Sequence, residues 1–345
     1  MKKIIIIIPY FGEFPNYFDL WMKSVKYNSD IDFLLITDND ITDKPNNIKI
    51  INISFEECVN RIQKNYKFKI KIPTPYRLST FKPAYGDIFQ DEIRGYDFWG
   101  WCDIDLIFGD LRKFLTDDIL TNNEKILSHG HLTLLKNNKK MNELYKVKKF
   151  DCINYKDAFS AGLLFNNFDE YPYGISRIAN KENIKVYNEG IFADLDSFFF
   201  TFRKLYSYLS KDDDSEEIIQ VFKWDKGKLF NIILQDNKRI EEEVAYVHFQ
   251  KRSMQNNDNC NDKYMIVPNK FINKEDLSNE EIIDICDLNK NKYYCEELRE
   301  KISKNRQKSF FKKLFSYIYW KNRIFRFKMI KILKIKPYEF SKGGF

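Results

Sequence analysis

The sequence predicts an α/β fold in which a mostly parallel central sheet carries helices on both faces. Two early segments, Lys3–Pro9 and Asp32–Thr37, are almost continuous apolar runs, as expected of strands buried on both faces. Segments with helical spacing of apolar residues separate such runs along the first hundred residues. The chain of 345 residues is also 43% hydrophobic and 17% aromatic, which is enough for a sizeable core and excludes a disordered protein.

The first half alternates between the two kinds of element. A helix is predicted over Phe14–Tyr27, because Tyr17, Trp21 and Val25 recur at helical spacing. The other elements predicted for this half are a strand at Ile48–Ile53, a helix over Phe55–Tyr66 capped by Ser54, a helix over Ser79–Ile93 and a strand at Phe98–Asp103. In such sheets ligands bind at the carboxyl ends of the strands, so the chemistry is expected there.

The second half mixes strands with helices and polar loops. The predicted strands are Lys125–Ser128, Leu132–Leu135, Asn183–Tyr187, Val244–Phe249 and Tyr264–Val267, and Lys211–Glu217 is a charged loop. No repeat and no Pro/Gly/Ser-rich linker divides this part of the sequence. We therefore expect one catalytic domain over residues 1–270, followed by a helical C-terminal extension over 271–345.

Cysteine usage and hydropathy exclude several classes of protein. The six cysteines form no CxxC pair and no zinc-finger spacing, which favours reduced, partly buried thiols. No segment reaches the roughly 18 uncharged apolar residues of a membrane span. The run Ile4–Ile8 is too short for the core of a signal peptide. A cytoplasmic protein is expected.

The strongest motif is the carboxylate pair Asp103 and Asp105, directly after the predicted aromatic strand. Side chains two residues apart on an extended segment point to the same side, while Ile104 points into the core. Two hard oxygen ligands at a strand end suit Mg²⁺ or Mn²⁺ and leave positions open for diphosphate oxygens. The competing interpretation, two solvated acids in a turn, is disfavoured by the flanking strand.

A second motif ends the strand at Val244–Phe249. His248 could complete the metal site through neutral imidazole, and Lys251 and Arg252 could bind diphosphate oxygens. The alternative is a hydrogen-bonded core histidine followed by surface cations. Taken alone that alternative would be favoured, and the pair of carboxylates makes the two interpretations nearly equal.

Other residues complete the expected binding site for a nucleotide diphosphate. Pro9, Tyr10 and Phe11 follow the first strand, where an aromatic ring can stack on a base, although one of the two rings is expected to pack in the core. Asp38 follows the second strand and could accept from a uracil N–H or a ribose hydroxyl. No GxGxxG motif is present, which disfavours a Rossmann dehydrogenase.

Three further predictions concern the same site. Lys82, at the start of the predicted helix, could contact phosphate or ribose. Asp169 and Glu170 are the expected catalytic carboxylates, one of them acting as general base on the acceptor hydroxyl if the enzyme inverts. A helix-start acidic pair is the alternative for them. His129 and His131 could line the acceptor cleft.

The run FKPAYGDIF, GYDFWGWCDIDLIFGDL, SHGHLTLLKNN and VHFQKR resembles a bacterial family of capsular and lipopolysaccharide glycosyltransferases with the GT-A fold. The resemblance covers residues 1–255. It implies a metal-dependent hexosyltransferase that moves a sugar from a nucleotide-diphosphate sugar, a UDP-sugar first, to a glycan acceptor in capsule or lipopolysaccharide biosynthesis. The pattern at His248 and Lys251 is also similar to glycogenin-like retaining enzymes, which implies a third metal ligand and a diphosphate contact. Those enzymes carry Gly where Gln250 stands here.

One alternative of another reaction class shares the carboxylate motif. Haloacid-dehalogenase-like phosphatases use the first Asp of a DxD as the nucleophile, with Mg²⁺ assisting. That motif normally follows the first strand and has Thr or Val where Ile107 stands here. A catalytically inactive surface-binding protein is a third possibility.

The C-terminal tail is strongly basic. Residues 301–345 contain fourteen Lys and Arg against one acidic residue, Glu339. Within Lys308–Lys336, which has no Gly or Pro, apolar residues recur at helical spacing between the cations. Such a helix is typical of an anionic membrane surface, so we expect a peripheral protein on the inner face of the cytoplasmic membrane, with a lipid-linked glycan among its acceptors. Packing on the acidic body or dimerisation is the alternative, and no nucleic-acid partner is expected.

Overall fold

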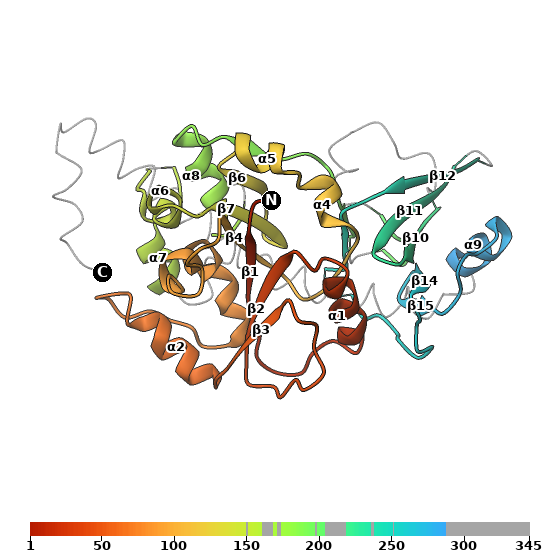
Figure 1. Ribbon diagram of the computed structural model, residues 1–345, viewed down its shortest axis with the longest axis horizontal. Helices are drawn as coiled ribbons and strands as arrows, with labels where there is room; N and C mark the ends of the chain where they lie inside the picture. Colours follow the sequence, from red (N-terminus) through yellow and green to blue (C-terminus); the bar gives the residue numbers. More distant parts are fainter. Residues whose placement is uncertain are drawn as a thin grey trace.

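The structure is a computed structural model that describes residues 1–149, 151–160, 168–170, 174–196, 199–203, 219–235, 238–250 and 252–287. The predicted charged loop at Lys211–Glu217 and the predicted basic tail helix lie outside these residues. A large sheet forms the middle of the molecule, and a smaller sheet stands beside it (Figure 1).

The large sheet has seven strands in the order β3-β2-β1-β4-β7-β6-β8. They are β1 (Ile4–Pro9), β2 (Ile31–Thr37), β3 (Ile48–Asn52), β4 (Phe98–Cys102), β6 (Lys125–His129), β7 (Leu132–Lys136) and β8 (Val186–Tyr187). Only β7 runs against its neighbours β4 and β6, because the two-residue turn between β6 and β7 joins antiparallel strands. The sheet is therefore mixed and mostly parallel.

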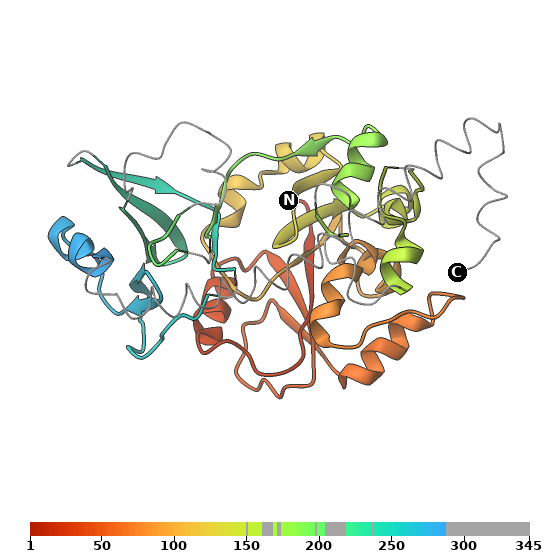
Figure 2. The same ribbon diagram turned by 180° about the vertical axis from the view of Figure 1, so that it is seen from behind.

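Helices cover both faces of this sheet. Alternate side chains of β1 enter two cores, with Ile4, Ile6 and Ile8 on one face and Ile5 and Ile7 on the other. The first face packs against α1 (Phe18–Lys26), α4 (Leu111–Phe114) and α5 (Asp117–Asn122). The second packs against α2 (Phe55–Gln63), α6 (Lys139–Asn142), η2 (Leu144–Lys146), α7 (Tyr155–Ser160) and α8 (Ile175–Lys181). Figure 2 shows from behind that α1 lies toward the small sheet and α2 away from it.

The predicted strands of the large sheet are all present, within a few residues of the expected bounds. The helix after Ser54 is also confirmed, with a capping box between Ser54 and Glu57. The predicted helix over Ser79–Ile93 is wrong. A 3₁₀ helix, η1 (Pro75–Ala84), and one turn, α3 (Tyr85–Ile88), replace it. Pro83 lies inside this stretch and lacks the N–H that an α-helix needs.

The small antiparallel sheet was not predicted between residues 219 and 243. Its order is β12-β11-β10-β14-β15, formed by β12 (Lys238–Glu243), β11 (Lys228–Gln235), β10 (Ile219–Asp225), β14 (Lys263–Val267) and β15 (Lys270–Ile272). The hairpin between β10 and β11 turns at Lys226 and Gly227, both with positive φ (46° and 87°). Helix α9 (Asn279–Cys286) packs Ile282 and Cys286 on this sheet. The start of the predicted 271–345 extension therefore shares a core with the sheet.

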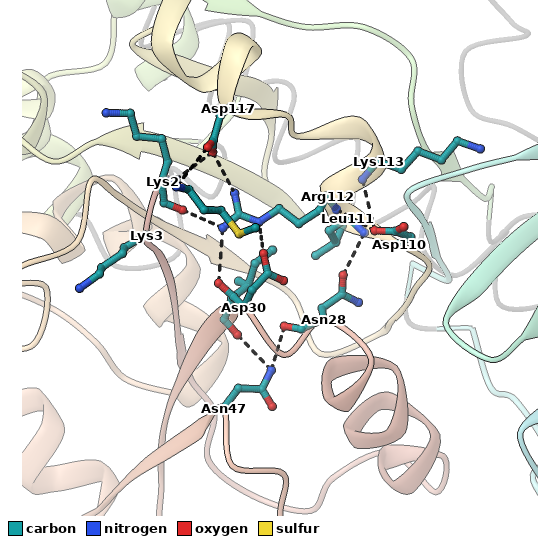
Figure 3. Close-up of polar contacts among 12 residues, drawn as sticks. Lys2, Lys3, Asn28, Asp30, Asn47, Asp110, Leu111, Arg112, Lys113 and Asp117 are labelled. Atoms are coloured by element: carbon teal, nitrogen blue, oxygen red, sulfur yellow. Dashed lines mark hydrogen bonds and ion pairs between the residues drawn. The ribbon is translucent and has the colours of Figure 1, made fainter.

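A polar cluster holds the amino ends of the first strands to the segment after Asp105 (Figure 3). Asn28 accepts from the backbone N–H of Leu111 at 2.9 Å and donates to the carbonyl of Gly109 at 2.9 Å. Arg112 pairs with Asp30 and donates to the carbonyl of Lys2 at 2.7 Å. These contacts hold the residues just before β1 and just before β2. They lie at the amino ends of the two strands, whereas the carboxylate motif lies at the opposite end of the sheet.

No helix among the described residues is long and apolar enough to cross a membrane.

Candidate functional site

A short three-stranded sheet brings three separate segments to the carboxylate motif. It consists of β5 (Leu106–Phe108), β13 (Tyr246–His248) and β9 (Ala193–Asp194), in that order. His248 pairs with Leu106 on one side and with Asp194 on the other. The backbone N–H of Phe249 donates to the carbonyl of Asp105 at 2.9 Å. The register therefore fixes His248 beside the carboxylate motif, although the two lie more than 140 residues apart in sequence.

The two motif carboxylates converge on one nitrogen. His248 Nε2 lies 3.4 Å from Asp105 Oδ1 and 3.9 Å from Asp103 Oδ2. The intervening Ile104 is buried in the core, as the alternation of an extended segment predicts. These three residues offer ligand atoms that all lie within 4.8 Å of one another. Two carboxylate oxygens and an imidazole nitrogen fit Mn²⁺, and the carboxylates also fit Mg²⁺.

Asp194 holds the other side of the imidazole. Its Oδ1 lies 2.7 Å from His248 Nδ1 and also accepts from Gln250 Nε2 at 2.8 Å. Burial disfavours the charged imidazole, but Asp105 and Asp194 outweigh it and raise the pKa of His248 to about 10. In the neutral ring, a proton held at Nδ1 by Asp194 would leave Nε2 free to face a metal ion, the arrangement usual for histidine ligands.

All three histidines of the chain form one row of rings. His131 lies 4.6 Å from His248 and 5.1 Å from His129 between ring centroids, and the planes of His129 and His131 differ by only 3°. Tyr246 Oη is 3.0 Å from His131 Nδ1, while His131 Nε2 has no hydrogen-bond partner among the described residues. His131 and His129 line the same cleft as His248, so the three rings form part of the wall of that cleft.

Lys82 joins the first motif carboxylate to a second pair of acids. Its Nζ lies 2.6 Å from Asp103 Oδ1 and 3.5 Å from Asp169 Oδ2, and it donates to the carbonyl of Gly130 at 2.8 Å. Burial works against its charge, but Asp103 and Asp169 outweigh it and raise the pKa of Lys82 above its usual range. Lys82 is thus a buried counter-ion at the centre of the site.

Asp169 and Glu170 face the motif across Gly130. Burial raises the pKa of both carboxyl groups, although Lys82 partly opposes the shift. A Cβ atom on Gly130 would lie 2.2 Å from Glu170 Oε1 and 2.8 Å from Asp169 Oδ2, so only glycine leaves room for them there. Asp169 is buried, whereas Glu170 is partly exposed in the cleft. Carboxyl groups with raised pKa values in a cleft are suited to proton transfer.

A single cleft of about 1870 Å³ joins these groups. Of the residues predicted for the site, its lining includes Pro9, Tyr10, Phe11, Lys82, Asp103, Asp105, Asp169, Glu170, His248 and Arg252. Tyr10 is half-buried, and its hydroxyl donates to the carbonyl of Glu13 at 2.9 Å. Phe11 is the ring of the pair that packs in the core, against Phe55.

Three predicted donor contacts are placed differently. Asp38 is exposed at the end of β2, outside the residues that line the cleft, with its carboxylate 3.5 Å from the N–H of Gly12. Lys251 lies outside the described residues. Arg252 lines the cleft but is 5% exposed, and its guanidinium already donates within the protein. The acceptors are the carbonyls of Asp196, Phe199 and Phe200 and the side chain of Asn269.

That Arg252 contacts diphosphate oxygens stays a prediction, and these bonds show that its guanidinium ties two neighbouring loops together. The sequence shows the charge of an arginine but not the carbonyls that will surround it. Asp194 and Gln250, in contrast, were missed. Asp194 lies in a D-x-D pattern, Asp194-Leu195-Asp196, but the chain contains several such patterns, so this signal alone does not single it out.

Residues 6–275 match a family described only as a family of unknown function, DUF6625. The chain belongs to this family. No curated protein sequence matches the DUF6625 chain.

Two solved glycosyltransferase structures are distantly similar to this DUF6625 member. Galactosyltransferase LgtC, crystallised with donor and acceptor sugar analogs, is 12% identical over 73% of this chain and 88% of its own, with a TM-score of 0.35. The glycosyltransferase GlyE of Streptococcus pneumoniae TIGR4, in its apo form, is 14% identical over 54% of this chain and 45% of its own, with a TM-score of 0.26. Similarities this low do not define a function, which has to come from the site itself.

Proposed function

We propose that this DUF6625 protein is a metal-dependent glycosyltransferase of the GT-A type. The observation that carries the proposal is the convergence of Asp103, Asp105 and His248 at the wall of a cleft. A cleft of about 1870 Å³ exceeds the roughly 300–1,000 Å³ usual for one small-molecule ligand, so it has room for a donor and an acceptor together. A transferase requires both at once, whereas a simple hydrolase requires one substrate and water.

Asp103, Asp105 and His248 would hold Mn²⁺ or Mg²⁺. A bound divalent ion would supply charge neutralisation for the departing nucleotide diphosphate. Tyr10, half-buried at the end of β1, offers its ring to the base of the donor. Lys82 links Asp103 and Asp169 through its ammonium group and would place a positive charge close to a donor oxygen that reaches them. Glu170, which is partly exposed and has a raised pKa, is placed to take the proton of an acceptor hydroxyl.

The finer parts of the proposal rest on the sequence resemblance described above. They are a UDP-sugar as donor, a hexosyl group as the transferred group, and a glycan or lipid-linked glycan acceptor in capsule or lipopolysaccharide biosynthesis. The basic tail would hold the enzyme on the anionic inner face of the cytoplasmic membrane. The catalytic domain over 1–270 and the extension over 271–345 belong to the same proposal, as does the diphosphate contact of Lys251.

Thermal shift and calorimetry with a panel of nucleotide sugars, with and without Mn²⁺, test the proposal. One nucleotide sugar should stabilise the protein only when Mn²⁺ is present, since a ligand that binds the folded state raises its stability. Asp103→Asn and Asp105→Asn should abolish that shift, while Asp118→Asn, an exposed acid on α5, should keep it. Equal binding by the wild type with a chelator present would refute the metal-dependent transferase.

The phosphatase alternative lacks support in the chain. Its nucleophile would have to follow the first strand, but β1 ends in Pro9-Tyr10-Phe11 without a carboxylate. The carboxylate pair follows β4 instead, and Asp103 is paired with Lys82 at 2.6 Å.

A further inference from the structure

The cleft is lined by an acidic group of residues and by a second group that contains no acid. Acids gather on the side of the metal group, where Asp103, Asp105, Asp169, Glu170 and Asp194 line the wall. The other side is formed by the end of β6, by α8 and by the approach to β8. Its lining residues are Ser128, Ser176, Asn180, Asn183, Ile184, Lys185, Val186 and Asn188, and none of them is acidic.

A fully buried lysine lies behind this second side. Lys125 of β6 is 0% exposed. Its Nζ donates to the carbonyl of Leu127, to Ser128 Oγ at 3.1 Å and to Ser176 Oγ at 3.3 Å, so its three donors meet only neutral acceptors. No ion pair of Lys125 occurs in the described part of the chain. Burial alone lowers the pKa of this lysine, to about 7, and no acid offsets it.

The local backbone is shaped to present this group to the cleft. β6 is irregular between Ile126 and His129, and Leu127 adopts a φ of 61°, which is unusual for a branched residue. This bulge turns the carbonyl of Leu127 toward Lys125 and places Ser128 in the cleft wall. Ser176 of α8 donates its hydroxyl to the backbone carbonyl of Ser128 at 3.2 Å, which ties α8 to the end of β6 beside Lys125.

A buried ammonium group without a counter-ion is costly, and an anionic ligand that supplied the opposite charge would offset that cost. We propose that the side of the cleft formed by Ser128, Ser176 and the asparagines of the α8–β8 segment is an acceptor subsite for an anionic sugar, whose carboxylate or phosphate is the counter-ion of Lys125. The side chains of Asn180, Asn183 and Asn188 are exposed along the same wall and suit sugar hydroxyls. This inference rests on the proposed function, because the bound anionic sugar is an acceptor only if the protein is a glycosyltransferase.

The test is direct binding of three probes, measured by calorimetry or saturation-transfer NMR on the full chain without metal or nucleotide. The probes are glucuronate, glucose 6-phosphate and glucose. At least one anionic probe should bind about tenfold or more tightly than glucose, the margin expected of one charge-assisted hydrogen-bond network. The two anionic probes distinguish a carboxylate from a phosphate.

Lys125→Met removes the charge while keeping the length of the side chain. It should reduce the binding of the preferred anion to the level of glucose, whereas Lys136→Met, an exposed lysine at the far end of β7, should not. A wild type that binds all three probes equally overturns the inference, whatever the variant does. Unchanged anion binding in a folded Lys125→Met overturns it as well. Because neither metal nor donor is present, failure here leaves the result of the nucleotide-sugar panel untouched.

Discussion

His248 Nδ1 lies 2.7 Å from Asp194 Oδ1, on the edge of the imidazole opposite to the nitrogen that faces Asp105. Parallel pairing of β9 with β13 sets this contact, since His248 is the register partner of Asp194. The carboxylate is buried and also accepts from Gln250, so it cannot turn away without leaving a donor unsatisfied. Asp194 is therefore a positioning residue, which fixes both the ring orientation and the tautomer of His248.

Replacing that carboxylate should weaken metal binding without removing a metal ligand. We expect Asp194→Asn to bind Mn²⁺ about 10- to 100-fold more weakly than the wild type, the range typical of outer-sphere partners of histidine ligands. Electron paramagnetic resonance of free Mn²⁺ measures this directly, and Asp118→Asn serves as the charge-matched control. An unchanged Mn²⁺ affinity in folded Asp194→Asn would show that the contact does not support a metal site.

Gly130 is the place where a single added methyl group should disturb the catalytic acids alone. Gly130→Ala forces Glu170 and Asp169 to move, because the new atom would lie 2.2 Å from Glu170 Oε1. A displacement of about 1 Å can cost around 100-fold in rate, so sugar transfer should fall by about that factor while Mn²⁺ and nucleotide binding persist. Gly190→Ala is the matched control, since a Cβ there meets no atom within 4 Å. Full transfer activity in Gly130→Ala would remove these two acids from the mechanism.

The contrast between these residues shows what a sequence can and cannot specify. Asp103 and Asp105 could be predicted to converge, because spacing of two on an extended segment fixes the direction of both side chains. Asp194 could not, since its position depends on β9, a strand of two residues whose pairing is set by the tertiary fold. The same limit applies to the hydrogen bonds of Arg252, because the carbonyls it binds belong to loops more than 45 residues away.

The core of the large sheet was more predictable than the small sheet for a related reason. β1 and β2 are buried on both faces and are therefore continuously apolar. β12, an edge strand with the sequence KRIEEE, is largely exposed and has no comparable pattern. Lys125 is the reverse case, a charged residue at the start of β6 whose burial no sequence pattern indicates.

Lys82 should be essential for stability as well as for activity. Lys82→Met leaves the carboxylates of Asp103 and Asp169 without their shared counter-ion, and breaking a buried pair in this way typically costs about 3–5 kcal/mol. Burial already raises the pKa of Asp169, so the ionised form is the costly one. The loss of stability should therefore be greater at pH 8 than at pH 5, where protonation relieves the repulsion. Urea denaturation at the two pH values measures it, with Lys136→Met as the control; a pH-independent loss would argue against the ion pair.

Lys125 should also make stability depend on pH, over a more alkaline interval than Lys82. Its pKa is lowered to about 7 in the folded protein from the ordinary value of 10.5, so the unfolded chain binds more protons between these values. Stability of the wild type should accordingly gain up to about 1.4 kcal/mol per pH unit from this group as the pH rises from about 7 to about 10. Lys125→Met cannot titrate, so the stability difference between variant and wild type should shift in favour of the wild type over that interval. Urea denaturation measures the free energy of unfolding of both proteins at each pH. If this free energy changes with pH equally in both, Lys125 has a counter-ion in solution. Burying Lys125 without a counter-ion lowers the stability of the folded protein. An anion bound in the adjacent cleft would offset this loss.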